Sequence, residues 1–263
     1  MLKKLLKYDL KSILKFLIIF YSLAIFFGLL TRLFFNFDNS FMLTLIAKIL
    51  SGTAISMMVS SLINNVMRLW VRFTNNFYKD ESYLTHTLPV NKRTLYTSKI
   101  LCSVITFFVT ALVIFLTIFV AYYSKENIEI LKNFLNPIIK GLNINVVRVV
   151  VSFVIIIFLE ILNMLQAGYT GIILGHKFNS NKIGFSVLFG FITYIALQII
   201  SFVSLYFVAL FNKDFMSLFT STNTITYETF NLIILVSSII YFALFIVNYI
   251  INIKLFEKGV NVE

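Results

Sequence analysis

The chain is poor in the residues on which soluble domains and many catalytic sites depend. It has one cysteine, Cys102, two histidines and two prolines among 263 residues, and only 13% of its residues are charged. A soluble domain carries about 25% charged residues. The single cysteine excludes an internal disulfide and a cysteine-based metal site, and the low charge excludes a soluble enzyme.

The sequence motifs of common catalytic and nucleotide-binding sites are also absent. The string most similar to a GxxxxGK[ST] phosphate-binding loop runs from Gly171 to Lys177, but its spacing is wrong, and neither HExxH nor GxSxG occurs. We therefore predict that the chain is not an enzyme and binds no cofactor itself. Any energy for work would come from another protein.

Apolar residues are plentiful. They make up 59% of the chain, with 30 Phe and 13 Tyr, which is more than one core can bury and too many for a disordered chain. A helix that crosses the hydrocarbon layer needs about 20 apolar residues. We predict an all-α polytopic membrane protein with six transmembrane helices in a single transmembrane domain, residues 1–263. The predicted spans are 13–33, 42–66, 100–122, 146–174, 183–211 and 230–253.

The formal net charge is +11. The basic residues gather at the ends of the apolar runs, which favours lipid headgroups and topology over nucleic acid as their explanation. If the N-terminus is inside, 15 of the 22 Lys and Arg residues lie on the inner side, so both termini are predicted to be cytoplasmic. Residues 1–15 alternate leucines with five lysines, which fits an amphipathic helix on the inner leaflet or simply a basic flank that fixes topology.

Polar residues inside the predicted fourth and fifth spans form a candidate polar pathway. Glu160 is the one acidic residue well inside an apolar run, and intramembrane ionisable groups usually face an interior. The alternative is an interhelical hydrogen-bond cluster in which neighbouring glycines permit close packing. The candidate pathway residues are Glu160, Asn163, Gln166 and Gln198.

Two further sets of small or polar residues follow helical spacing. Such ladders allow close helix approach, and packing explains them better than a polar interior. The second span carries Gly52, Ser56, Ser60 and Asn64, and the fifth carries Gly190, Tyr194, Gln198 and Ser201.

The segment between the second and third spans mixes acids, bases, aromatic residues and a proline. Because Pro89 disfavours helix in the residue before it, we predict a short cytosolic helix over 80–88. Lys92 and Arg93 would then lie at the lipid headgroups and fix the depth of the third span.

The string Tyr78-Lys-Asp-Glu-Ser-Tyr-Leu-Thr-His-Thr-Leu-Pro-Val resembles the permease subunits of type-2 ATP-binding-cassette exporters. In that family a stretch of the form DE-x-Y-L-x-x-T-L-P follows the second span and is taken to form the coupling helix that sits on the ATPase. The layout of six spans with short loops is similar too. This chain lacks a large extracellular domain after its first span, which suggests the compact bacterial branch associated with peptide-antibiotic immunity or export.

The resemblance implies a role for the chain, its partners and its contact residues. It implies a permease that moves a hydrophobic or amphipathic cargo, such as an antimicrobial peptide, across the bacterial cytoplasmic membrane. A separate cytosolic ATPase would bind ATP and Mg²⁺, and the permease would pair with a second copy or a related permease. The implied ATPase-coupling residues are Tyr78, Asp80, Glu81, Tyr83, Leu84, Thr85, Thr87, Leu88 and Pro89.

The residues alone leave two other functions open. One is an ATP-independent carrier or channel that uses Glu160, and the other is a non-transporting membrane scaffold or sensor partner. The small number of prolines counts against the carrier, because many ion-coupled carriers use broken helices.

Overall fold

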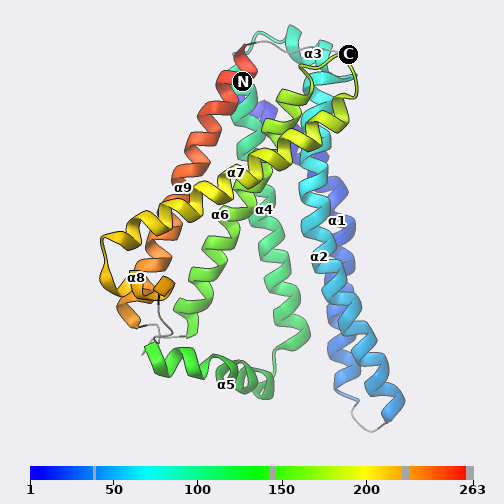
Figure 1. Ribbon diagram of the computed structural model, residues 1–263. Helices are drawn as coiled ribbons and strands as arrows, with labels where there is room; N and C mark the ends of the chain where they lie inside the picture. Colours follow the sequence, from blue (N-terminus) through cyan, green and yellow to red (C-terminus); the bar gives the residue numbers. More distant parts are fainter. Residues whose placement is uncertain (38–39, 143–145, 221–225, 259–263) are drawn as a thin grey trace. The chain divides into compact units, whose positions relative to one another are not determined.

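The computed structural model describes residues 1–37, 40–142, 146–220 and 226–258, and every regular element within them is a helix (Figure 1). Six of these helices are long and apolar enough to cross a membrane, which confirms the predicted six-span, all-α architecture. The six are α1 Leu2–Phe35, α2 Phe41–Tyr78, α4 Lys92–Tyr122, α6 Val146–Gly175, α7 Lys182–Leu210 and α9 Tyr227–Glu257. The shorter helices between them are α3 Ser82–Thr87, α5 Lys125–Leu142 and α8 Lys213–Thr220.

The first two long helices extend well beyond their apolar runs. At 1.5 Å per residue, the 34 residues of α1 span about 51 Å and the 38 residues of α2 about 57 Å. The hydrocarbon core is only about 30 Å thick, so both helices continue outside it. Residues 2–15 belong to α1 without a break. The residues of the predicted amphipathic N-terminal helix are therefore helical, but they are the first turns of the helix that forms the first span rather than an element of their own.

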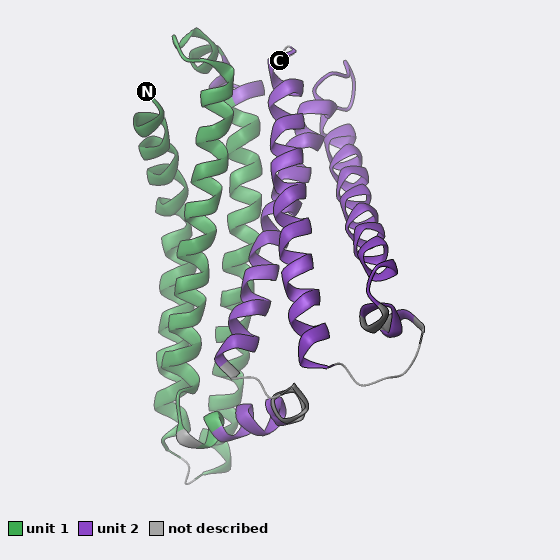
Figure 2. Ribbon diagram, turned by 90° about the vertical axis from the view of Figure 1, so that its left-hand side faces the viewer, with its two compact units in different colours: residues 1–76, 83–128 green, residues 77–82, 129–263 purple. Residues whose placement is uncertain are grey.

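The chain divides into two compact units (Figure 2). The first contains Met1–Asn76 and Tyr83–Ile128, and the second contains Phe77–Ser82 and Glu129–Glu263. Each unit contributes three of the six long helices.

In the first unit, α1 and α4 run in the same direction side by side. Asp9 bonds Lys99 near one end of the seam, and Arg32 bonds the carbonyl of Val120 near the other. The sequence separations of these pairs are 90 and 88 residues, and so nearly constant a separation requires a parallel pair. The core of this unit is apolar, with buried side chains that include Ile13, Leu17, Ala24, Leu69, Phe73 and Phe107.

The second unit repeats this plan with different residues. Its first and third long helices, α6 and α9, are parallel: Asn163 bonds the carbonyl of Tyr241 across 78 residues, and Gln166 bonds that of Phe245 across 79. The middle helix α7 lies antiparallel against α6. Each unit thus packs its first long helix parallel to its third.

Large apolar side chains remain exposed along the long helices. Examples are Ile63 on α2, Phe108 on α4 and Phe202 on α7, all more than half exposed. A soluble protein rarely exposes so continuous an apolar surface, whereas lipid tails accept it. Length, composition and exposure together establish a multi-pass membrane protein.

Candidate functional site

The segment that carries the family resemblance forms the short helix α3 between α2 and α4. The predicted helix over 80–88 is too long: α3 covers only Ser82–Thr87. Asp80 and Glu81 form a turn closed by a 2.7 Å bond from the Ser82 amide to the Lys79 carbonyl. Leu88 lies outside the helix because it precedes Pro89, whose ring disfavours helical backbone in the residue before it.

Several predicted coupling residues lie on the surface of this segment. Tyr83 and Leu84 are adjacent and strongly exposed, at 66% and 74% of their surface. Leu88 is 44% exposed. These side chains lie outside the candidate spans, on the segment that joins α2 to α4. Among the other predicted coupling residues, Asp80, Thr87 and Pro89 are exposed, and Glu81 and Thr85 are half-buried.

Tyr78 does not fit the predicted role. Its side chain is 1% exposed, and its ring stacks on the His176 ring with centroids 4.2 Å apart. The preceding Phe77 packs edge-on against Phe256 of α9 at 4.7 Å. The prediction that Tyr78 anchors a partner is therefore wrong, because the ring is buried within its own chain.

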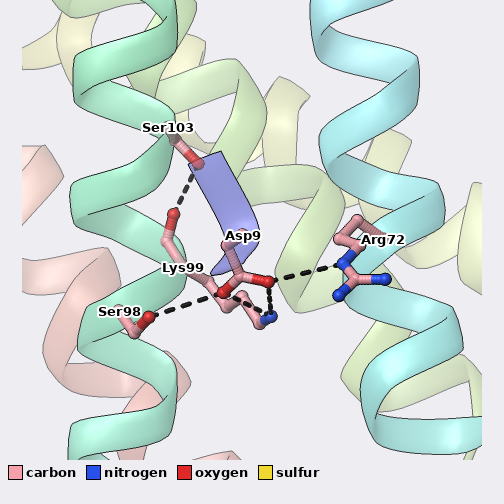
Figure 3. A network of polar contacts seen from close by, with 5 residues as sticks. All are labelled: Asp9, Arg72, Ser98, Lys99 and Ser103. Atoms are coloured by element: carbon pink, nitrogen blue, oxygen red, sulfur yellow. Dashed lines mark hydrogen bonds and ion pairs between the residues drawn. The ribbon is translucent and has the colours of Figure 1, made fainter. Parts of the chain in front are cut away.

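A buried charged cluster holds the three long helices of the first unit together (Figure 3). Asp9 of α1 lies between Lys99 of α4 and Arg72 of α2. The Lys99 ammonium donates to both carboxylate oxygens at 2.8 and 2.7 Å, and Arg72 Nε lies 3.4 Å from Oδ1. Ser98 Oγ donates to Oδ2 at 3.5 Å.

This cluster is nearly closed to solvent. The side chains of Asp9 and Lys99 are 5% and 8% exposed, and that of Arg72 is 20% exposed. Burying a charge is costly unless it is paired, and the Lys99 ammonium, bonded to both oxygens, supplies the pairing. Arg72 lies near the end of α2 and Lys99 near the start of α4. The cluster therefore ties both helices that flank α3 to α1.

Sequence reasoning did not single out Asp9. In the sequence, Asp9 lies among five lysines within residues 1–15, and Lys99 looks like one more basic residue at the end of a span. A usable signal was present in the helical period, since the buried residues of α1 recur every three or four positions. They are Asp9, Ile13, Leu17, Tyr21, Ala24, Gly28 and Thr31.

A second polar cluster lies deeper in the first unit. Thr110 Oγ donates to the carbonyl of Thr106 at 2.8 Å and accepts from Asn65 Nδ2 at 2.9 Å. A hydroxyl has one hydrogen to donate, so the 2.6 Å bond to Tyr21 must be donated by the tyrosine. These bonds join α1, α2 and α4.

In the second unit, two of the candidate pathway residues are used in helix packing. Asn163 Nδ2 donates to the carbonyl of Tyr241 at 2.9 Å, and Gln166 Nε2 donates to that of Phe245 at 3.0 Å. Both side chains are fully buried. The structure thus supports the packing interpretation for Asn163 and Gln166 rather than a polar path.

Further along the same seam, Thr170 continues the cluster. Its hydroxyl lies 2.8 Å from Asn252 Oδ1, and Asn252 Nδ2 donates to the carbonyl of Gln166 at 3.2 Å. A line of hydrogen bonds thus joins α6 to α9 through the interior of the unit.

Glu160 faces α7 instead. Its Oε1 accepts bonds from Gln198 Nε2 and, at 2.9 Å, from the hydroxyl of Tyr194. Its Oε2 is buried and, within the described residues, accepts no hydrogen bond. The side chain of Tyr241 on α9 faces the same carboxyl group, within reach of a hydrogen bond as well as of its charge. Of the four candidate pathway residues, Glu160 and Gln198 thus meet at the interface between α6 and α7. Asn163 and Gln166 lie at a different interface, between α6 and α9.

Helix geometry explains why the predicted face divides. At 100° per residue, Asn163, Gln166 and Thr170 lie about 60–120° from Glu160 on one side. Gly171 and Gly175 lie about 20–60° away on the other side. Two neighbours, α9 and α7, occupy these two sides, and Glu160 lies between them.

The α6–α7 interface is a contact between backbones. A Cβ atom added to Gly171 would lie 2.6 Å from the Cα atom of Gly190, and one added to Gly175 would lie 2.6 Å from the Cα atom of Ser186. Neither distance leaves room for a side chain. By contrast, a Cβ atom added to Gly52 of α2 would have no neighbour within 4 Å. The small-residue ladder of α7 therefore packs against α6 at Gly190, whereas the ladder of α2 has no neighbouring atoms around Gly52.

Across the described part of the chain, no group of three or more His, Cys, Asp and Glu side chains is placed to hold a metal ion. Comparison with known proteins adds no family to this geometry. No protein-family model, curated protein or solved structure matches the chain. The family resemblance therefore depends on the residues from Tyr78 to Val90 and on the layout of the spans.

Proposed function

We propose that the chain is the permease subunit of a bacterial ABC exporter, driven by ATP hydrolysis in a separate cytosolic ATPase. The observation that carries the proposal is the exposed pair Tyr83 and Leu84 on α3, outside the candidate spans. An exposed aromatic residue beside an exposed leucine suits a partner surface, because aromatic residues dominate the binding energy at protein interfaces.

The charged cluster gives α3 a mechanical connection to the first unit. Because Asp9 holds both α2 and α4, a push on the segment between these helices is passed to α1 as well. Closure of the ATPase around ATP would supply that push. The cargo would be hydrophobic or amphipathic, such as an antimicrobial peptide, and the permease would act in the cytoplasmic membrane as a pair of copies or of related chains.

The proposal predicts the effect of truncating the α3 surface. Tyr83→Ala and Leu84→Ala should each weaken ATPase binding by about 2 kcal/mol, which is about thirtyfold at 1.4 kcal/mol per tenfold. The tagged full chain is purified from its host membranes, and co-purifying ATP hydrolysis is measured. Phe115→Ala is the matched control, since it removes an equally exposed ring from inside a span, 69% exposed against 66% for Tyr83.

The control should retain the co-purifying ATPase. If Tyr83→Ala and Leu84→Ala both retain it as well, α3 is not the coupling surface. If the wild-type chain purifies without an ATPase and still transports, the exporter proposal is wrong.

The second candidate function is an ATP-independent carrier. One specific observation favours it: Glu160 is an ionisable side chain inside a candidate span, its Oε2 is buried, and its carboxyl group could take up a proton or ion. Dissipating the proton gradient at constant ATP should stop a carrier directly and leave an exporter running. A scaffold would show no flux under either condition.

A further inference from the structure

Helix α5 has an unusual place in the chain, because it lies between two spans without being one. Only Tyr123 and Ser124 separate it from the end of α4, and only residues 143–145 separate it from the start of α6. Its 18 residues include Lys125, Lys132, Lys140, Glu126 and Glu129, and charges at this density are too costly for the hydrocarbon core.

Two hydrogen bonds define the start of α5, and one of them reaches the end of α4. Ser124 Oγ accepts from the Asn127 amide at 3.1 Å, as an N-cap does. Asn127 Nδ2 donates to the carbonyl of Tyr122 at 2.9 Å, which satisfies one of the carbonyls left open at the end of α4. Glu126 in the first turn suits the positive end of the helix dipole. The helix therefore begins at the depth where α4 ends.

Between residues 126 and 136 the two faces of α5 are sharply different. At 100° per residue, the polar side chains lie within about 60° of Glu129, and the apolar ones lie about 100° or more away from it. The polar set is Glu126, Glu129, Lys132, Asn133 and Asn136, and the apolar set is Ile128, Ile130, Leu131, Phe134 and Leu135. Asn127 is the exception on the apolar side, and its amide is used by the Tyr122 carbonyl.

Three of the five apolar side chains on this face are strongly exposed. Ile130 is 64% exposed, Leu131 50% and Phe134 77%. Three large apolar side chains on one face of a short helix cannot be left in water without cost, at about 25 cal/mol for each Å² of apolar surface.

The position of α5 decides what covers this face. Because both its ends join spans within a few residues, the helix lies where those spans leave the hydrocarbon layer. The material at that depth is the boundary between lipid headgroups and acyl chains. An amphipathic helix with a charged face lies in that boundary with its apolar face about 5–10 Å below the headgroups.

We infer that α5 is an interfacial helix embedded in the lipid leaflet on the side of the membrane opposite α3, with Ile130, Leu131 and Phe134 inserted among the acyl chains. The opposite side follows from connectivity, since α4 crosses between α3 and α5. The occupant of the apolar face is lipid. The inference does not depend on the exporter proposal, because it needs only the membrane spans.

The test is a nitroxide scan of α5 in the full-length chain. The single native cysteine is removed as Cys102→Ala, and single cysteines carrying a spin label replace Glu129, Ile130, Lys132, Asn133 and Phe134 in turn. The protein is placed in vesicles of phosphatidylcholine and phosphatidylglycerol. Collision rates are measured with oxygen, which concentrates in acyl chains, and with the water-soluble complex nickel ethylenediamine diacetate.

The two collision rates should vary with the helical period and in opposite phase. Labels at 130 and 134 should favour oxygen, at a depth of about 5–10 Å, and labels at 129, 132 and 133 should favour the nickel complex. The inference is overturned if all five labels favour the nickel complex, since the helix then stands in water. It is also overturned if both reagents are excluded at 130 and 134, since protein, such as a second copy of the chain, then covers the face.

Discussion

Neutralising Asp9 should destabilise the first unit strongly. In Asp9→Asn the side chain keeps its size and its reach to Ser98, but the buried carboxylate that Lys99 and Arg72 both contact loses its charge. Removing one partner of a buried ion pair costs about 3–5 kcal/mol. The low exposure of Asp9 and Lys99, 5% and 8% of their side chains, places this pair in that class rather than among surface pairs.

The single thiol of the chain provides the assay. Cys102 is 1% exposed and lies on α4 close to Lys99, so a maleimide dye that fluoresces on reaction with thiols reports the unfolding of this unit on heating. At about 2–4 °C per kcal/mol for domains of 150–250 residues, the midpoint should fall by about 6–20 °C. Asp80→Asn, the same change at an exposed carboxylate, is the matched control and should leave the midpoint unchanged.

A second variant separates charge from packing. Adding Lys99→Met to Asp9→Asn removes the ammonium as well, and buried ion pairs replaced by apolar residues often regain stability. The double variant should therefore melt above Asp9→Asn. If Asp9→Asn melts with the wild type, or if the double variant melts lower still by the sum of two separate losses, the charged cluster does not hold the helices as described.

The remaining predictions concern α6, α2 and α3. Gly171→Ala should lower the thermal midpoint by the equivalent of about 1–3 kcal/mol, because overpacking forces the backbones of α6 and α7 apart. Gly52→Ala, which has open space around it, should leave the midpoint unchanged. Equal effects of the two substitutions would refute the backbone contact. Glu160→Gln should keep or raise the midpoint while lowering transport, because the amide still accepts from Tyr194 and a buried charge is gone. A lower midpoint with full transport would make the residue structural. In Leu84→Ala the midpoint should stay at the wild-type value while ATPase binding falls, since the side chain is 74% exposed. A parallel loss of both would mean misfolding rather than a lost contact.

The sequence predicts the spans well because each depends on local composition. A run of about 20 apolar residues marks a membrane helix whatever its neighbours are. The ends of the helices are less predictable. Leu2 to Lys15 are helical because the helix propagates from the span into a region of alternating leucine and lysine, and that cooperative extension leaves no apolar signal.

The candidate site shows where sequence reasoning stops. The helical period places Glu160, Asn163 and Gln166 on one broad face, but it does not say that two different helices cover the two sides of that face. Tyr78 carries the same sequence signal as Tyr83, and only packing against His176 distinguishes the buried ring from the exposed one. To predict that Asp9 is buried, one would have to know that it pairs with Lys99, which lies 90 residues away in the sequence. Long-range partners of this kind are decided by tertiary packing and are invisible to local pattern.

The glycine contact between α6 and α7 has a mechanical consequence. Side chains between two helices act as a compliant layer, because rotamer changes let the helices slide past one another by small steps. At Gly171 and Gly175 that layer is missing, so any sliding brings backbone atoms into collision. We therefore expect α6 and α7 to move together as one rigid body. Within the second unit, compliance is left to the seam with α9, where the hydrogen bonds of Asn163 and Gln166 to backbone carbonyls can be exchanged one at a time.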